Sequence, residues 1–179
     1  MSFFPGGDPE PGDKFSCDAI DPAFSHSPIT ALPDIANGGL SARVVIGDFA
    51  GLGSPVPTHS GTLYVDLMLA PRASAPFDAA WEERAIYVLE GSVQISGDQF
   101  ADDRLLVLRP GDPTAITAGE DGARMVLLGE DSMGGKRHIW WNFVSSSNER
   151  IKQAKAEWRA GPFDIVPGDE EEFIPLPEK

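Results

Sequence analysis

The chain has 179 residues, with 14 Lys and Arg against 28 Asp and Glu, which gives a formal net charge of −14. This length fits one ordinary domain better than two. So acidic a surface repels phosphate backbones, which argues against direct binding to nucleic acid and against anionic membranes. No run of 18 apolar residues is present, so no segment is expected to span a bilayer.

The first part of the chain predicts an extension. Residues 1–14 are rich in Gly, Pro and Asp, and we expect residues 1–40 to form a partly flexible N-terminal extension. The segment lacks the basic and apolar regions of a secretory signal. Cys17 is the only cysteine, so no internal disulfide can form and the cytoplasm is the expected compartment.

Short strands are predicted through the middle of the chain, in residues 41–145. Apolar residues alternate with others from Leu63 to Leu69, a period of two that is typical of a strand. Residues 86–89 and 93–95 predict two strands joined at Gly91, and residues 115–118 and 125–128 predict two more. Short strands divided by Gly and Pro turns indicate a sandwich or barrel.

A single helix is predicted near residues 147–160. Ser146 and Glu149 have the spacing of a capping box, and Gly161 with the following proline ends the segment. Ile151 and Trp158 fall on one stripe, so we expect Trp158 to be buried against the β body. We expect the tail after the helix to lie over the surface of the domain. Residues 146–179 are thus predicted to form a C-terminal helix and tail.

Two kinds of motif carry a resemblance to a known family. The segment AIYVLEGSVQISG (85–97) and the later Arg-Pro-Gly-Asp turn are similar to a cupin double-stranded β-barrel, or jelly roll. The segment KRHIWWNFVSSS (136–147) resembles the C-terminal part of bacterial pirin-like proteins, as does SPVPTHSGTLYVDLML (54–69). The resemblance covers roughly residues 40–178. It implies a mostly β protein with a single cupin-like barrel of the pirin C-terminal type and one C-terminal helix.

The resemblance also implies where a metal would bind. Metal-binding cupins use a His-x-His pair, a Glu and a later His, whereas this chain has three dispersed histidines and no His-x-His. Measured back from Gly91, the usual glutamate position falls on Arg84, with Glu83 one residue away. We therefore expect no metal or other cofactor. The alternative is an iron site built from His59, His138 and Glu83.

The strand His138–Phe143 is expected to send Trp140 and Trp141 to opposite faces.

At the barrel mouth, five residues are candidates for a ligand pocket. A guanidinium there favours a small anionic ligand. These candidates are Arg84, Tyr87, Trp81, Met125 and Glu83.

Three functions follow from these patterns. The first is a non-catalytic module that binds a small ligand or regulates by contact with a protein partner. The second is a metal-dependent dioxygenase similar to quercetinases, which the family resemblance includes. The third is an interaction protein, since pirins are also viewed as transcriptional cofactors. The dispersed histidines favour a protein that is not an enzyme, and the loss of a neighbouring cupin domain favours a homodimer.

Overall fold

A computed structural model describes residues 24–132, 135–161, 168 and 174–177. The described chain divides into two compact units, residues 24–132 and the described residues from 135 onward. The predicted leader at residues 1–14 and Cys17 lie outside the described residues. The elements of the first unit are η1 (Ile29–Ala31), β1 (Asp34–Asn37), β2 (Leu40–Ile46), β3 (Asp48–Phe49), β4 (Leu52–Gly53), β5 (Thr62–Leu69), β6 (Ser74–Phe77), β7 (Glu83–Ile95), β8 (Asp98–Ala101), β9 (Arg104–Leu108) and β10 (Thr114–Glu130). Those of the second are β11 (His138–Trp140), β12 (Phe143–Ser145) and α1 (Asn148–Ala160).

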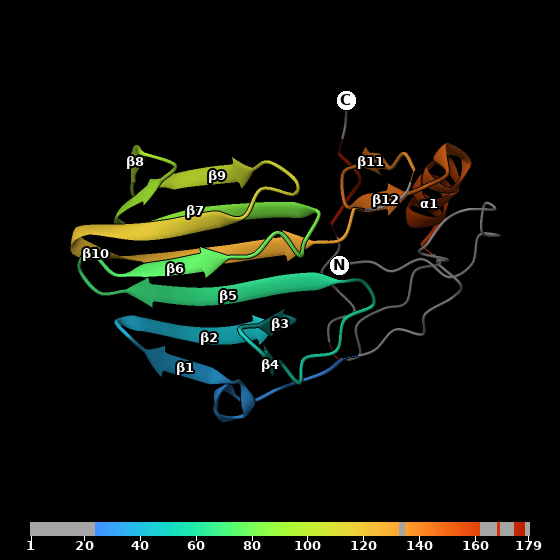
Figure 1. The fold of residues 1–179 in the computed structure, drawn as a ribbon. Coiled ribbons are helices and arrows are strands. Elements are labelled where there is room, and N and C mark those ends of the chain that lie inside the picture. Colours follow the sequence, from blue (N-terminus) through green and yellow to red (C-terminus); the bar gives the residue numbers. More distant parts are fainter. Residues whose placement is uncertain (1–23, 133–134, 162–167, 169–173, 178–179) are drawn as a thin grey trace. The chain divides into compact units, whose positions relative to one another are not determined.

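One eight-stranded antiparallel sheet forms most of the first unit. Its strand order is β1-β2-β5-β10-β7-β8, and two further strands join it, β6 on β10 and β9 on β7. Figure 1 shows the two longest strands, β7 and β10, side by side in the middle of the sheet. The first half of β7 pairs with β9 and its second half with β8, so β8 and β9 lie end to end along one edge of β7.

The two long strands are where the sequence prediction was wrong in detail. Four strands were expected, yet β7 and β10 each run through a glycine as one bent strand. Gly91 lies opposite Ala123 and has φ +77°, and Gly122 has φ +84°. A Cβ at Gly91 would lie 2.2 Å from the carbonyl oxygen of Gly122, so the two backbones meet at the bend. The glycines bend the ladder instead of ending it, because β7 and β10 stay paired with each other on both sides of the bend.

The core lies on one face of this sheet. In β5 the expected alternation is confirmed: four apolar side chains are at most 3% exposed, and those between them point outward. The same alternation in β2, β6, β7 and β10 directs one set of side chains into a single cluster. The largest apolar members of this cluster are Phe77, Leu63, Leu67, Ile86, Ile116, Met125 and Leu127.

The second unit begins with a hairpin, which corrects the prediction of one strand over residues 138–143. β11 and β12 pair antiparallel across a turn at Trp141 and Asn142, and Trp141 has φ +52°. Because the chain reverses there, Trp140 and Trp141 join one aromatic cluster with Phe143 and Trp158 instead of pointing to opposite faces. Trp141 stands edge-on to Trp158, with ring centroids 5.3 Å apart.

The predicted helix is present as α1, with its cap one residue later than expected. Ser147 is the N-cap, and its side-chain oxygen accepts a hydrogen bond from the Arg150 amide, so no capping box forms between Ser146 and Glu149. Ile151 is buried, whereas Trp158 is half-buried and donates its indole N–H to the Ile174 carbonyl at 3.0 Å. Within the described residues, no helix has both the length and the apolar character needed to cross a bilayer.

Candidate functional site

Arg84 is the most unusual side chain of the first unit. It lies on the inner face of β7 with 2% of its surface exposed. One terminal nitrogen donates to the carbonyls of Phe77 and Asp78, both at 3.1 Å, and the other to those of Arg109 and Asp112, at 2.9 and 2.6 Å. The guanidinium carbon also lies 5.5 Å from the centroid of the Phe77 ring. The guanidinium therefore connects the C-terminal end of β6 to the loop that follows β9.

One donor of Arg84 is left over. Its Nε–H is buried and has no hydrogen-bond partner among the described residues. A buried guanidinium normally uses all of its N–H groups, since an unsatisfied buried donor costs about 1–3 kcal/mol. The Nε–H is thus the N–H group of this guanidinium for which the described residues supply no acceptor.

The five candidate pocket residues are divided between the two faces of the sheet. Arg84 and Met125 lie inside, and Trp81 packs against the same core cluster. Trp81 covers Gly129, the register partner of Arg84, because a Cβ at Gly129 would lie 2.8 Å from the Trp81 ring. Glu83 is exposed, and Tyr87 is half-buried on the opposite face, where its hydroxyl lies 3.5 Å from a carboxylate oxygen of Asp103.

The residues available for a metal do not fit one. Glu83 is exposed, His59 is exposed in the loop before β5, and His138 belongs to β11 of the other unit. Over residues 24–132 and the shorter described stretches, no three His, Cys, Asp or Glu side chains form a group that could hold a metal ion. A catalytic metal needs about three protein ligands and an open position.

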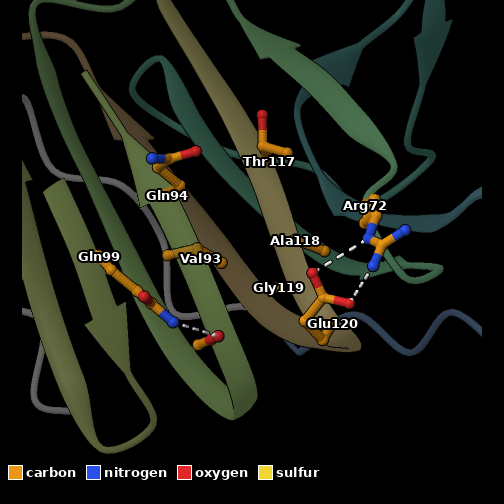
Figure 2. Close-up of a pocket in the computed structure, with 9 residues that line it drawn as sticks. Arg72, Val93, Gln94, Gln99, Thr117, Ala118, Gly119 and Glu120 are labelled. Atoms are coloured by element: carbon orange, nitrogen blue, oxygen red, sulfur yellow. Dashed lines mark hydrogen bonds and ion pairs between the residues drawn. The ribbon is translucent and has the colours of Figure 1, made fainter. Parts of the chain in front are cut away.

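The outer face of the sheet carries a groove beyond the bend, which no local pattern in the sequence indicated. This polar groove has a volume of about 260 Å³. Figure 2 shows amide and hydroxyl side chains along it and an Arg72–Glu120 ion pair at one end. Gln99 donates to the Ser92 hydroxyl at 3.2 Å. The lining residues are Arg72, Ser92, Val93, Gln94, Gln99, Thr117, Ala118, Gly119 and Glu120.

A second outer surface, before the bend, is apolar. The registers place Val107 beside Ala85, Ala85 beside Leu128, and Leu128 beside Tyr64, in one row across β9, β7, β10 and β5. Leu105 and Tyr87 continue the surface in the next row. We call the outward side chains of Tyr64, Ala85, Tyr87, Leu105, Val107 and Leu128 the apolar face. The run of Leu and Val in β9 was the available sequence signal, since every second side chain of an edge strand faces outward.

Ion pairs border the apolar face. Arg124 makes two hydrogen bonds to Asp66, at 3.1 and 2.9 Å, and these bonds raise the pKa of the Arg124 guanidinium. Arg43 likewise makes two to Asp34, at 2.7 and 2.9 Å, and lowers the pKa of the Asp34 carboxyl. Asp34 and Arg43 are register partners, whereas Arg124 reaches Asp66 diagonally, since Asp66 lies opposite Val126; in each pair the cation neutralises the carboxylate that it contacts.

The fold defines the class of protein. This bent antiparallel jelly roll is similar in fold to solved cupin-type structures. Among them is a quercetin 2,3-dioxygenase from Acinetobacter baumannii, with a TM-score of 0.71 and 24% identity over 83% of this chain and 50% of that one. The expectation of a mostly β, cupin-like protein with one helix is confirmed.

The particular family follows from sequence. Residues 64–164 match the model of the Pirin C-terminal cupin domain, and the chain belongs to the pirin family. It is 43% identical over 160 residues to a pirin-like protein of Caulobacter vibrioides, covering 89% of this chain and 55% of that protein. It is 31% identical over 167 residues to a Pseudomonas aeruginosa protein provisionally named quercetin 2,3-dioxygenase, covering 89% of this chain and 52% of the relative. The chain thus spans about half the length of these relatives.

Proposed function

We propose that this pirin-family chain is a binding and regulatory module that does not catalyse dioxygenation by itself. The observation that carries the proposal is Arg84. The family's glutamate position falls on or beside it, and here a buried guanidinium is hydrogen-bonded to four backbone carbonyls. A guanidinium stays charged at ordinary pH, so it cannot become a metal ligand, and its charge opposes a divalent cation nearby.

The module would act in the cytoplasm as a homodimer that contacts a protein partner. Its apolar face supports this part of the proposal, because exposed apolar surface on a folded domain commonly marks a contact site. The small ligand expected at Arg84 is an anion, bound by the free Nε–H. Of the five pocket residues first expected, we propose Arg84 and Trp81 for this ligand, because both lie on the inner side at Gly129.

The second candidate is a dioxygenase of the quercetin type. The name of the P. aeruginosa relative, at 31% identity, is the observation that favours it. In this chain the alternative needs iron held by His59, His138 and Glu83.

The test measures metal and reaction together. We expect elemental analysis after exhaustive dialysis to find well under one equivalent of transition metal, and we expect added Fe(II) to cause no oxygen uptake with quercetin. A stoichiometric metal that is lost in His59→Ala or His138→Ala would overturn the proposal and support the dioxygenase. An intact fold in both variants, checked by circular dichroism, serves as the control.

A further inference from the structure

Strand β9 forms a free edge of the large sheet. It pairs with β7 on one side, and none of the strands in the described residues pairs with its other side. Leu105 is 57% exposed and Val107 is 73% exposed. Natural edge strands are usually protected by lysine, proline, a bulge or a covering loop, because their unpaired backbone groups can bind another strand. Within β9 the one charged residue is Arg104, so this edge is poorly protected.

We propose that β9 pairs antiparallel with β9 of a second copy of this chain, around a two-fold axis at Leu106. The sheet then continues from one copy into the other, and the two apolar faces become one surface. This inference names the contact of the homodimer proposed above. It does not depend on whether the chain is catalytic.

The register follows from the side chains of the strand. A two-fold axis perpendicular to the sheet keeps the outward side chains of both copies on the same, outer face. Outward residues of one copy can therefore lie opposite only outward residues of the other. When the axis lies at Leu106, Leu105 of each copy lies opposite Val107 of the other copy, so the contact contains this apolar pair twice. A shift to a centre at Leu105 would place Val107 opposite Asp103 instead. A shift to a centre at Val107 would place Leu105 opposite Arg109.

Charge complementarity favours the same register. Asp103 and Arg109 flank β9 and are exposed, and with the axis at Leu106 each lies near the other residue of the second copy, just past the end of the strand, where Asp103 turns with φ +56°. Opposite charges directly across an antiparallel pair are favourable, and like charges are not. With a formal charge of −14 on each chain, two copies repel at long range. Two local pairs of opposite charge at the ends of an apolar contact counter that repulsion.

Both ends of β9 are held in place before any partner binds. The Arg109 carbonyl accepts a hydrogen bond from Arg84 at 2.9 Å. At the other end, the Asp103 amide donates to the Val88 carbonyl at 3.0 Å, and the Asp103 carboxylate lies near the Tyr87 hydroxyl on the outer face. Such preorganisation lowers the entropy lost on association.

The first test is disulfide cross-linking of the full chain in a Cys17→Ser background. Leu105→Cys and Val107→Cys are made as separate proteins. We expect neither protein alone to form a covalent dimer under mild oxidation, and we expect an equal mixture of the two to form one, because only unlike positions face each other in this register.

Other cross-linking results overturn the proposal. Covalent dimers of Leu105→Cys alone or of Val107→Cys alone would place the axis at that residue. No dimer in the mixture would show that these edges do not meet.

The second test is sedimentation at tens of micromolar. We expect a dimer for the natural sequence, and we expect Val107→Lys to weaken its association by at least about tenfold, since it buries two unpaired ammonium groups near the axis. Ile139→Lys is the matched control, because Ile139 is also 73% exposed but lies in the hairpin of the other unit. Equal loss in both variants, or a monomer for the natural sequence, would overturn the interface while leaving the metal test of the proposed function unaffected.

Discussion

The outer face of the large sheet has two halves of opposite character. Before the bend at Gly91 and Gly122 it carries the apolar face, and beyond the bend it carries the polar groove. The same strands, β7 and β10, supply side chains to both halves, and their inward side chains form one core. The inner face therefore determines the fold, while the outer residues are free to differ, and here they place an apolar surface, which we propose for protein contact, beside a polar groove.

The largest effect is expected from a substitution on the inner face, because both halves of the outer face depend on the same core. Arg84→Ala removes a buried cation and leaves four carbonyls without their donor. We expect a loss of about 3–5 kcal/mol in the free energy of unfolding, measured with urea.

Arg72→Ala is the control for that change. Arg72 makes an ion pair with Glu120 at the end of the polar groove, where both side chains are 74% exposed, and we expect a loss within about 0.5 kcal/mol. Similar losses in the two variants would mean that Arg84 is not the structural link described above.

The bend itself gives the next largest effect. Gly91→Ala places a Cβ 2.2 Å from the Gly122 carbonyl oxygen at a φ of +77°, and we expect a loss of about 2–3 kcal/mol from strain and displacement. Gly97→Ala is the matched control, because Gly97 has φ +93° and no atom near the added Cβ. Its loss should be about 1 kcal/mol, from the φ alone. Equal losses in the two variants would show that the close approach of the two backbones at the bend does not add to the cost of the Gly91→Ala substitution.

Much of the fold followed from local pattern. The alternation from Leu63 to Leu69 predicted β5, and the segment ending at Gly161 predicted α1. The motif at residues 136–147 indicated the pirin family. In each case the signal lies within about a dozen consecutive residues, where periodicity and capping act.

The errors arose where distant segments decide the outcome. Gly91 was expected to end a strand, but Gly122 and Ala123 of β10 hold the chain in the ladder. Arg84 was expected at a pocket mouth. Its own segment carries no sign of the backbone carbonyls of residues 77–78, 109 and 112 that accept its hydrogen bonds, because these lie elsewhere in the sequence. The polar groove likewise is lined by residues from separate parts of the chain, namely 72, 92–94, 99 and 117–120. Tertiary contacts of this kind leave no local signal.

A smaller effect separates the ion pairs of the two halves. Asp66 and Arg124, beside the apolar face, are 34% and 42% exposed, whereas the Arg72–Glu120 pair at the groove is 74% exposed on both sides. We expect Asp66→Ala to cost about 0.5–1 kcal/mol and Glu120→Ala less than that, since exposed pairs are screened by water. Urea unfolding at low and high salt measures both, and a larger loss for Glu120→Ala would contradict the comparison.

The smallest effect concerns Asp34, at the rim of the apolar face. The two hydrogen bonds from Arg43 lower the pKa of Asp34 below its ordinary value of 3.8. A carboxyl with a lowered pKa in the folded state stabilises the fold above its unfolded pKa, and this contribution is lost as the pH falls through the folded value. Asp34→Asn should therefore reduce stability slightly at pH 7, and the difference from the natural sequence should vanish in acid below that lowered pKa. Asp98→Asn on β8, beyond the bend, is the control, because Asp98 forms no ion pair within the described residues. A difference for Asp34→Asn that stays constant from neutral pH into acid would show that the ion pair does not stabilise this edge of the sheet.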